Sequence, residues 1–429
     1  MFQALRVRDF RLLWAGDLAS DVGSWLLVLA VPAHVFLVTG SLRATGLTLA
    51  AEYLPILLLG PVAGVIADRC DRRRLMIGAS LACAAAVAVM LAGLPPGRYW
   101  VLYAALVAEN SGIVLCAPAW QARIPAIVGT GPMLSSAGAL NAVSSGTVRL
   151  IGGPLGGVLL AVAGIRWLIC ADAASYLVAA GAIALTSRSG RYAPVCVPAR
   201  HGRTARPRVT ALRRLPAVAL HDLSEGIRCL RREPPARTLL PVTAAFLAAN
   251  ASLSAVLIPF ALRRLGGSGP AGFLLAALGA GFLVGAPVIR WLVDRVQPRA
   301  LLAVTLSASA AACLALFTSS ALATALPAAV AVGLSGSMTL TAAQVTVQRV
   351  VPNAVLGRVT AAFLTAEAAV TLAGAVAGPV LAQSAGLPAT AAVAAAVMLL
   401  AAALARLTIP RLATLIPLPQ QEGTRSAAP

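Results

Sequence analysis

Long apolar stretches dominate the chain and alternate with short polar ones. Twelve of these stretches are about 20 residues long or longer, the length at which an α-helix crosses the hydrocarbon core of a bilayer. The pattern therefore predicts an all-α polytopic membrane protein with twelve transmembrane helices. The expected spans are residues 11–38, 42–66, 75–94, 99–119, 133–163, 165–186, 239–262, 271–292, 300–319, 322–346, 356–381 and 388–409.

A polar segment, residues 187–237, separates the spans into two sets of six. It contains 12 arginines and several prolines, which make it too polar and too broken to cross a membrane. We expect short amphipathic helices there, lying on the anionic inner leaflet. The predicted organisation is an N-terminal six-helix bundle (1–186), a cytoplasmic arginine-rich linker (187–237), a C-terminal six-helix bundle (238–410) and a disordered cytoplasmic tail (411–429).

The composition excludes several classes of protein. Hydrophobic residues make up 59% of the chain and the mean hydropathy is +0.87, so a soluble fold would have no place for so much apolar surface. The alternating pattern of a membrane β-barrel is absent from the sequence. The sequence also has no nucleophile elbow, P-loop or HExxH motif, and its seven cysteines show no metal-ligand spacing. We therefore expect no enzymatic activity, no metal and no cofactor.

The net charge of +20 comes from arginine, because the chain has 34 arginines and no lysine. If the N-terminus lies in the cytoplasm, 28 arginines fall on the cytoplasmic side and 5 outside. This asymmetry fixes the orientation of a membrane protein, so the charge reflects topology and not a nucleic-acid partner. We expect a multi-pass protein of the inner (cytoplasmic) membrane of a bacterium, with both termini cytoplasmic.

Three sequence marks recur at nearly one offset, which predicts two pseudo-symmetric halves. In transporters built from such parallel repeats the substrate site lies near the midplane, between the halves. The matching marks are Asp68-Arg69 with Arg73 and Asp294-Arg295 with Arg299 (226 residues apart), Gln121-x-x-Ile-Pro125 and Gln348-x-x-Val-Pro352 (227), and Gly153-Pro154 and Gly378-Pro379 (225).

Several motifs carry a family resemblance. The segment Gly64-x-x-x-Asp68-Arg69-x-x-Arg72-Arg73 resembles the signature between the second and third helices of the major facilitator superfamily, although Asp71 stands where the family usually has glycine. The stretch from Ile151 to Gly157 is similar to the Gly-Pro motif of the family's antiporters. Pro118 to Pro125, and Gln348 to Pro352 with Gly357-Arg358, resemble the macrolide-efflux and siderophore-exporter branch of the twelve-helix drug:proton antiporters.

The resemblance implies a transporter of a small-molecule substrate. Its energy source would be the proton gradient, its surroundings membrane lipid, and its working form a monomer. One departure concerns the fourth span, 99–119, which has no arginine of the kind that drug:proton antiporters of a neighbouring branch carry there.

Six of the seven residues from Asp68 to Arg74 are charged, and they lie between two apolar spans. The orientation rule accounts for the arginines but not for Asp68, because acids contribute little to topology. A carboxylate at this position suits the N-terminus of another helix, and the resemblance implies that this helix begins near residues 353–357 and that the contact closes the cytoplasmic side. The predicted gating motif comprises Gly64, Asp68, Arg69, Arg72, Arg73, Asp294 and Arg295.

Pairs of small residues four positions apart let helices approach closely in lipid. They occur in the spans 42–66, 133–163, 271–292 and 356–381, whose counterparts in the superfamily form the moving seam between the halves. The predicted seam residues are Gly60, Gly152, Gly153, Pro154, Gly156, Gly157, Gly281, Gly285, Gly374 and Gly378.

Ionisable residues inside a membrane cost about 2.5–3.5 kcal/mol each on insertion scales, so they mark function by default. A medium of low dielectric favours the protonated form of a carboxyl, as a proton carrier requires. The proton-coupling candidates are Asp17, Asp21, Glu52, Glu109, Asp172 and Glu367. Arg149 is the expected charge partner of one of these acids, Glu109 or Asp172, and a paired acid is a poorer proton carrier.

Polar residues that share one helix face predict the wall of a wet cavity. Asp17, Asp21 and Ser24 have this spacing, at i, i+4 and i+7. The other residues expected to line the cavity are Asn141, Ser145, Asn250, Thr341, Gln344 and Thr371.

These features favour a secondary active exporter, a proton antiporter of a bulky, largely apolar compound such as a drug or secondary metabolite. An uptake permease or symporter and a lipid flippase of the same fold remain open, as does a non-transporting membrane scaffold or sensor. A sugar permease would carry more Asn, Gln and Trp on facing stripes. A scaffold would add a folded soluble domain, for which residues 187–237 are too few and too rich in arginine.

The gating motif generates a prediction for Asp68→Asn. This variant should insert normally but transport more slowly, because a neutral side chain loses the attraction to a helix N-terminus. Transport rates are compared at equal surface levels, and a normal rate at the wild-type level would contradict the proposed role of Asp68.

Overall fold

The computed structural model describes residues 2–187 except 96 and 130, residues 234–350 except 267 and 294, and residues 353–409. In this part of the chain twelve long helices account for nearly all of the structure. They are α1 (Arg8–Thr39), α2 (Leu42–Arg69), α3 (Arg72–Met90), α4 (Tyr99–Val128), α5 (Pro132–Val162), α6 (Ile165–Ala184), α9 (Pro234–Arg264), α10 (Ser268–Leu292), α11 (Pro298–Thr318), α12 (Leu322–Val350), α13 (Asn353–Ala385) and α14 (Leu387–Thr408).

The predicted fold class, an all-α membrane protein, is confirmed. Eleven of the helices have the length and hydropathy to cross a membrane, and α5, with 31 residues, is the twelfth long helix of the described part. The sequence pattern placed most helix ends within a few residues. The exception is the end of α4, which lies nine residues beyond the expected 119. The helix does not end at its prolines, since Pro118 and Pro125 both lie inside it. Neighbouring helices satisfy the backbone groups that proline frees, so proline is tolerated there.

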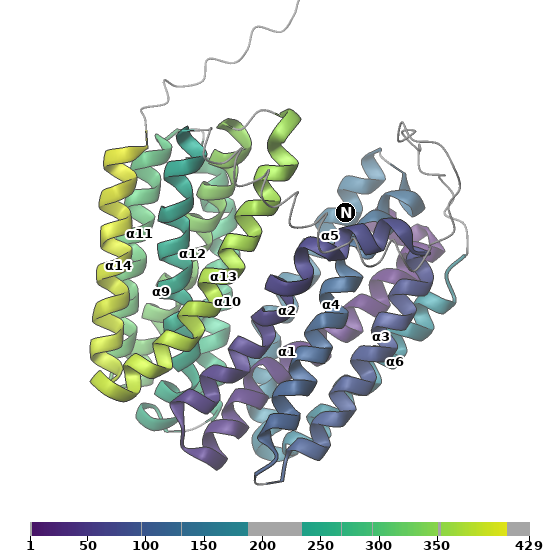
Figure 1. The fold of residues 1–429 in the computed structure, drawn as a ribbon, viewed down its shortest axis with the longest axis horizontal. Coiled ribbons are helices and arrows are strands. Elements are labelled where there is room, and N and C mark those ends of the chain that lie inside the picture. The colour runs from purple at the N-terminus through teal and green to yellow at the C-terminus, as the bar shows by residue number, and fades with distance from the viewer. Residues whose placement is uncertain are drawn as a thin grey trace, which may run out of the picture.

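The helices form two bundles that lie side by side, α1–α6 and α9–α14 (Figure 1). We call them the N-terminal half and the C-terminal half. Corresponding helices pack alike: α1 contacts α6 and α3 contacts α4 in the first half, as α9 contacts α14 and α11 contacts α12 in the second. Most of the predicted linker, 188–233, and all of the predicted tail, 411–429, lie outside the described residues.

The two halves meet through the helix pairs α2–α13 and α5–α10. At the α2–α13 crossing Gly46 lies directly against the ring of Pro379, and at the α5–α10 crossing Gly146 faces the Leu283 side chain. These are the four helices that the seam prediction named. The seam between the halves therefore consists of the expected helices.

Packing across the seam is concentrated at one end of the molecule. We call the end that holds the first residues of α1 and the last residues of α14 the terminal side, and the opposite end the far side (Figure 1). Toward the far side Leu29, Ala33 and Phe36 of α1 belong to one hydrophobic cluster with the C-terminal half. Arg263 of α9 also donates to the carbonyl O of Gly40 at 3.1 Å, and its guanidinium lies 4.8 Å from the Phe36 ring centroid.

On the terminal side the halves diverge. The hydrophobic cluster at this end of the N-terminal half, which includes Phe10, Met76 and Ile127, contains residues of that half only. A Cβ added to Gly60 or Gly64, toward the terminal end of α2, would meet no described atom within 4 Å. Among the described residues, the halves therefore pack against each other toward the far side and diverge toward the terminal side (Figure 1).

The predicted seam glycines do not lie in the seam. A Cβ at Gly152 or Gly156 of α5 would meet Trp25 or Leu26 of α1, within the same half. Gly281 and Gly285 of α10 likewise face α12, and Gly374 and Gly378 of α13 face α9. Spacing of i, i+4 shows that a helix has a groove but not which neighbour fills it, so the prediction was wrong for these six glycines. A Cβ at Gly60 would have no described neighbour within 4 Å, and the role of Gly60 stays a prediction. The packing around Gly153 and Pro154 is outside the described part of the structure.

The glycine contacts generate a prediction with an internal control. Gly60→Ala should raise stability slightly, because alanine is favoured over glycine in a helix by about 0.8–1.0 kcal/mol and the site is open. Gly156→Ala should lower it by about 1–3 kcal/mol, because the new Cβ would lie 2.6 Å from the carbonyl O of Leu26. Thermal unfolding in detergent measures both. Equal shifts for the two variants would contradict the close approach of α1 and α5.

Candidate functional site

A cavity of about 330 Å³ lies inside the N-terminal half. The helices α1, α3, α4 and α6 form most of its wall, and Asn141 of α5 completes it. The lining includes Asp17, Asp21 and Ser24, so the predicted stripe on α1 does line a cavity. Its described wall includes three aromatic side chains, Trp25, Trp120 and Tyr176, and no basic one. We call it the acidic cavity.

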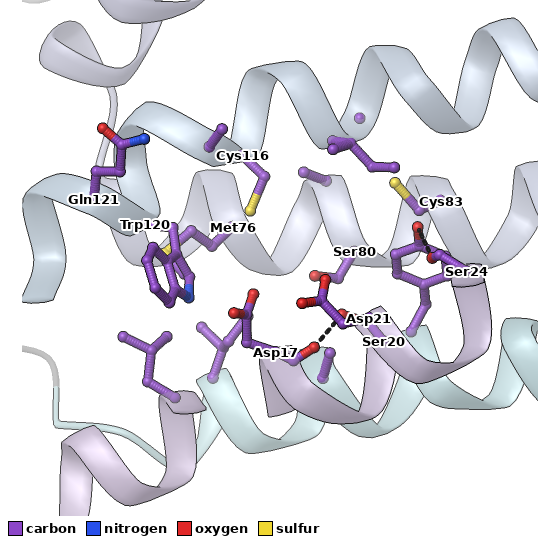
Figure 2. Close-up of a pocket in the computed structure, with 18 of the residues that line it drawn as sticks. Asp17, Ser20, Asp21, Ser24, Met76, Ser80, Cys83, Cys116, Trp120 and Gln121 are labelled. Carbon is purple, nitrogen blue, oxygen red and sulfur yellow. Dashed lines mark hydrogen bonds between the residues drawn. The ribbon is translucent and has the colours of Figure 1, made fainter. Parts of the chain in front are cut away.

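The two aspartates of α1 point from that helix into the acidic cavity, toward α3 and α4 (Figure 2). Oδ2 of Asp21 accepts a hydrogen bond from the Ser145 hydroxyl of α5 at 3.4 Å. The Ser20 hydroxyl donates to the backbone carbonyl of Asp17 at 3.0 Å. Opposite them stand Met76 and Ser80 of α3 and Cys116, Trp120 and Gln121 of α4 (Figure 2).

A buried polar network continues from the cavity between α1, α4 and α6. The Tyr176 hydroxyl donates to Oε1 of Glu109 at 3.1 Å and lies 3.0 Å from the Ser24 hydroxyl. Glu109 is only 5% exposed. Ser24 lines the cavity and Glu109 does not, so the tyrosine links a carboxyl behind the wall to a hydroxyl on its surface.

Asp172 of α6 lies beside this network and is completely buried. Its Oδ1 accepts from Ser175 at 3.1 Å, and its Oδ2 has no hydrogen-bond partner among the described residues. A buried acceptor without a partner costs free energy, and protonation of the carboxyl reduces that cost. The described partners of Glu109 and Asp172 are hydroxyls. The predicted partner Arg149 has its side chain outside the description, so this pairing stays a prediction.

Two smaller cavities lie between the halves. One, of about 250 Å³, is formed by α2, α9 and α13 and contains Tyr53, Asn250, Glu367 and Thr371. The other, of about 220 Å³, lies between α1, α9, α10 and α12. Asn250 and Ser254 line both cavities. We therefore treat the two cavities as one site and call it the interface region.

Trp25 lies at the boundary between these sites. It lines both the acidic cavity and the interface cavity of α9, α10 and α12. Close contact between Gly152 and the Cβ of Trp25, where a Cβ on the glycine would lie at 2.7 Å, fixes α5 against this side chain. Trp25 is therefore shared by the wall of the acidic cavity and the wall of a cavity between the halves.

The remaining predicted residues are dispersed. Glu52 is half-buried on α2, within electrostatic range of Glu109. Thr341 is half-buried and Gln344 exposed on α12, and neither lines the three cavities. Among the described residues no three His, Cys, Asp or Glu side chains gather in a group that could hold a metal ion.

Of the predicted gating motif, the structure describes a side-chain contact for Arg73, and this contact is made within the N-terminal half. The side chains of Asp68 and Arg69, and all of Asp294, lie outside the description. Arg73, however, donates to the carbonyl O of Ala184, the last residue of α6. Positive charge is favoured at a helix C-terminus, so Arg73 holds the end of α6 in this state. Asp71 caps α3, with Oδ1 accepting from the backbone N–H of Arg74 at 2.8 Å.

A buried arginine reinforces the same corner. Arg123 of α4 is 7% exposed and donates to the Thr186 hydroxyl at 3.0 Å and to the Ser187 carbonyl at 2.7 Å. Asp9 accepts from the backbone N–H and the hydroxyl of Ser187. The chain is therefore fixed where it leaves the N-terminal half.

The family follows from sequence comparison over the whole chain. The profile of the transmembrane secretion effector family, part of the major facilitator superfamily (MFS), matches residues 1–421. The chain belongs to this family. It is 26% identical over 285 residues to the uncharacterized MFS-type transporter YfiS of Bacillus subtilis, covering 64% of this chain and 62% of YfiS. It is 31% identical over 131 residues to macrolide efflux protein A of Streptococcus pyogenes, covering 30% and 32%. Both matches span less than two thirds of the relative's length.

Solved transporters share the fold. A bacterial homologue of the human lysosomal transporter Spinster, in an inward-facing and unoccupied conformation, has a TM-score of 0.68 at 18% identity and covers 94% of this chain and 97% of its own. A POT family transporter in complex with a thioalcohol conjugated peptide has a TM-score of 0.69 at 11% identity, covering 92% and 95%. At these identities the likeness establishes the twelve-helix fold alone.

Sequence reasoning missed several residues of this MFS transporter's site. Tyr176, Trp25 and Trp120 were not singled out, because an aromatic residue in an apolar span looks like lipid-facing or core surface. Arg123 was counted as a topological charge only. A signal existed for Tyr176, since it follows Asp172 by four residues and so shares its helix face.

The buried network generates a prediction for Tyr176→Phe. Loss of the hydroxyl leaves Glu109 without its described donor, which should lower the free energy of unfolding by about 1–3 kcal/mol. In a Glu109→Met background the same change should cost much less, because the acceptor is gone. Thermal unfolding of the four proteins of this cycle measures the coupling. Equal costs in both backgrounds would contradict the network.

Proposed function

We propose that this MFS transporter is a secondary active exporter that couples inward proton flow to expulsion of a bulky, largely apolar compound. The observation that carries the proposal is the acidic cavity: two aspartates of α1 line it, and it shares Trp25 with a cavity between the halves. The partial sequence match to a macrolide efflux protein supports export.

The packing supports transport by alternating access. The far side is closed by Leu29, Phe36 and the Arg263 contacts, while the terminal side is open. With the termini in the cytoplasm, as the arginine distribution favours, this is the inward-open state, ready to take a compound from the cytoplasm or the inner leaflet. Rocking of the halves about the α2–α13 and α5–α10 crossings would then open the far side.

The cavities also suggest which compounds fit. The interface region has an apolar wall with Trp25, Phe246 and Phe282 and a few polar groups from Asn250 and Ser254. The acidic cavity next to it carries two aspartates and, among its described lining residues, no basic side chain. An apolar compound with a protonated amine would match both, because aromatic faces and carboxylates attract a cation.

Proton coupling would use the same carboxyls. A proton that reaches Asp21, and through Ser24 and Tyr176 the Glu109 carboxyl, neutralises the site and weakens its hold on a cationic compound. Glu367 at the interface is a second candidate. Binding of compound and proton would then exclude each other, which is what exchange requires.

The test uses inside-out vesicles that contain the protein and have an acidified lumen. A panel of macrolides, siderophores, dyes and sugars is added while luminal pH is followed. We expect an apolar amine to trigger proton loss from the lumen, and the Asp21→Asn/Glu367→Gln variant to give none. A response to sugars alone would favour a permease. Silence across the panel by folded protein would remove the drug-export proposal and leave a lipid flippase or a scaffold.

Protection of Cys116 from thiol reagents gives an independent readout of binding. This thiol lines the acidic cavity, so a compound that enters should slow its labelling in a variant that retains no other cysteine. Labelling at an unchanged rate in the presence of a transported compound would place the binding site elsewhere.

A further inference from the structure

We propose that a separate site at the outer edge of the C-terminal half binds the phosphate group of an anionic phospholipid. The site is a cavity of about 480 Å³ on the terminal side, lined by Arg295, Val296, Gln297, Arg299, Ala300 and Arg406. It shares no residue with the acidic cavity or the interface region.

Three arginines from separate parts of the chain converge on this cavity. Arg295 lies in the connection between α10 and α11, Arg299 in the first turn of α11 and Arg406 in the last turn of α14. Nε of Arg299 donates to Oε1 of Gln297 at 3.0 Å. None of the described residues that line the cavity is a carboxylate. Asp294, adjacent in sequence, lies outside the described residues, and its charge would still leave the cluster at a net +2.

Comparison with the equivalent corner of the N-terminal half shows that this cluster is an addition. Arg299 corresponds to Arg73 by the repeat offset of 226. Arg73 donates a hydrogen bond to the Ala184 carbonyl at the end of α6. Arg406 has no counterpart, because offsets of 225 to 227 place Gly181, Ala180 or Ala179 at that position. The C-terminal half thus brings a second cation to a place where the first half has a small apolar residue.

The three positive charges repel one another, which is unfavourable. An anion bound between them is attracted to all three and offsets this repulsion. Arginine is well suited to phosphate, because its planar guanidinium donates two parallel hydrogen bonds. The N-terminus of α11 adds a favourable dipole. These features point to a phosphate group as the ligand.

The position of the cavity identifies the source of the phosphate. The helices α11 and α14, whose ends line the cavity, lie on the side of the C-terminal half away from the N-terminal half (Figure 1). Trp291 and Leu407 beside it are 62% and 84% exposed, as expected of lipid-facing residues. The Arg295 guanidinium lies 4.1 Å from the centroid of the Trp291 ring, and tryptophan marks the depth of lipid headgroups. Basic pockets between helices at this depth bind anionic headgroups.

The experiment titrates the purified full-length protein with phosphatidylglycerol or phosphatidylcholine and counts bound lipid by native mass spectrometry. We expect the wild type to prefer phosphatidylglycerol. Arg299→Gln/Arg406→Gln should weaken that binding about 30-fold, from the roughly fivefold that each arginine near an anionic surface contributes. Arg299→Lys/Arg406→Lys keeps the charge and should retain most of the affinity, which separates a binding defect from misfolding.

Arg98→Gln/Arg166→Gln is the matched control, because it removes the same charge near the far-side ends of α4 and α6. Equal loss of phosphatidylglycerol in this control, or no loss in Arg299→Gln/Arg406→Gln, would overturn the site. Displacement of the lipid by inorganic phosphate at similar concentrations would show a soluble-anion site and overturn the lipid assignment.

Discussion

The cost of placing carboxyl groups in a hydrocarbon medium constrains this protein more than any other single factor. Each such group is unfavourable by about 2.5–3.5 kcal/mol on insertion scales, yet the N-terminal half contains five of them in its spans. In the structure four of these carboxyls lie close to one another or to hydroxyl groups. Asp17 and Asp21 face a shared cavity, Glu109 accepts from Tyr176 and Asp172 accepts from Ser175.

This clustering divides the work between the halves. The C-terminal half has one acid in its described spans, Glu367, and a continuous apolar core that extends across the seam to Leu29 and Phe36. Most of the carboxyl groups within the spans therefore lie in the N-terminal half. Trp25 lies where the two regions meet, so movement of α1 relative to α9 would change how the acidic cavity communicates with the interface region.

The two halves also differ where the repeat predicts that they should agree. Arg73 and Arg299 occupy equivalent positions, yet Arg73 binds the end of α6 while Arg299 shares a cavity with Arg406. A duplicated fold keeps its backbone geometry because helix packing demands it. Side chains at the rim are free to diverge, so rim residues are where the halves acquire separate contacts.

The sequence by itself determined the number of long helices in the described part of the chain, their approximate ends, the division into two halves and the candidate acids. It could do so because a bilayer demands about 20 apolar residues per span and penalises every charge within it. Even the four helices of the seam were identified from their small residues and the family resemblance. The stripe of Asp17, Asp21 and Ser24 followed from helical spacing alone.

Only the tertiary structure decided which neighbour each helix face meets. Gly156 has the spacing of a seam residue but packs on Leu26 of its own half, whereas Gly46, which was not among the predicted seam residues, meets Pro379 across the seam. Tyr176 gained its role from Glu109, 67 residues away. Periodicity along a chain fixes the direction of a side chain relative to its own helix, but the identity of the facing residue depends on how twelve helices pack together in three dimensions.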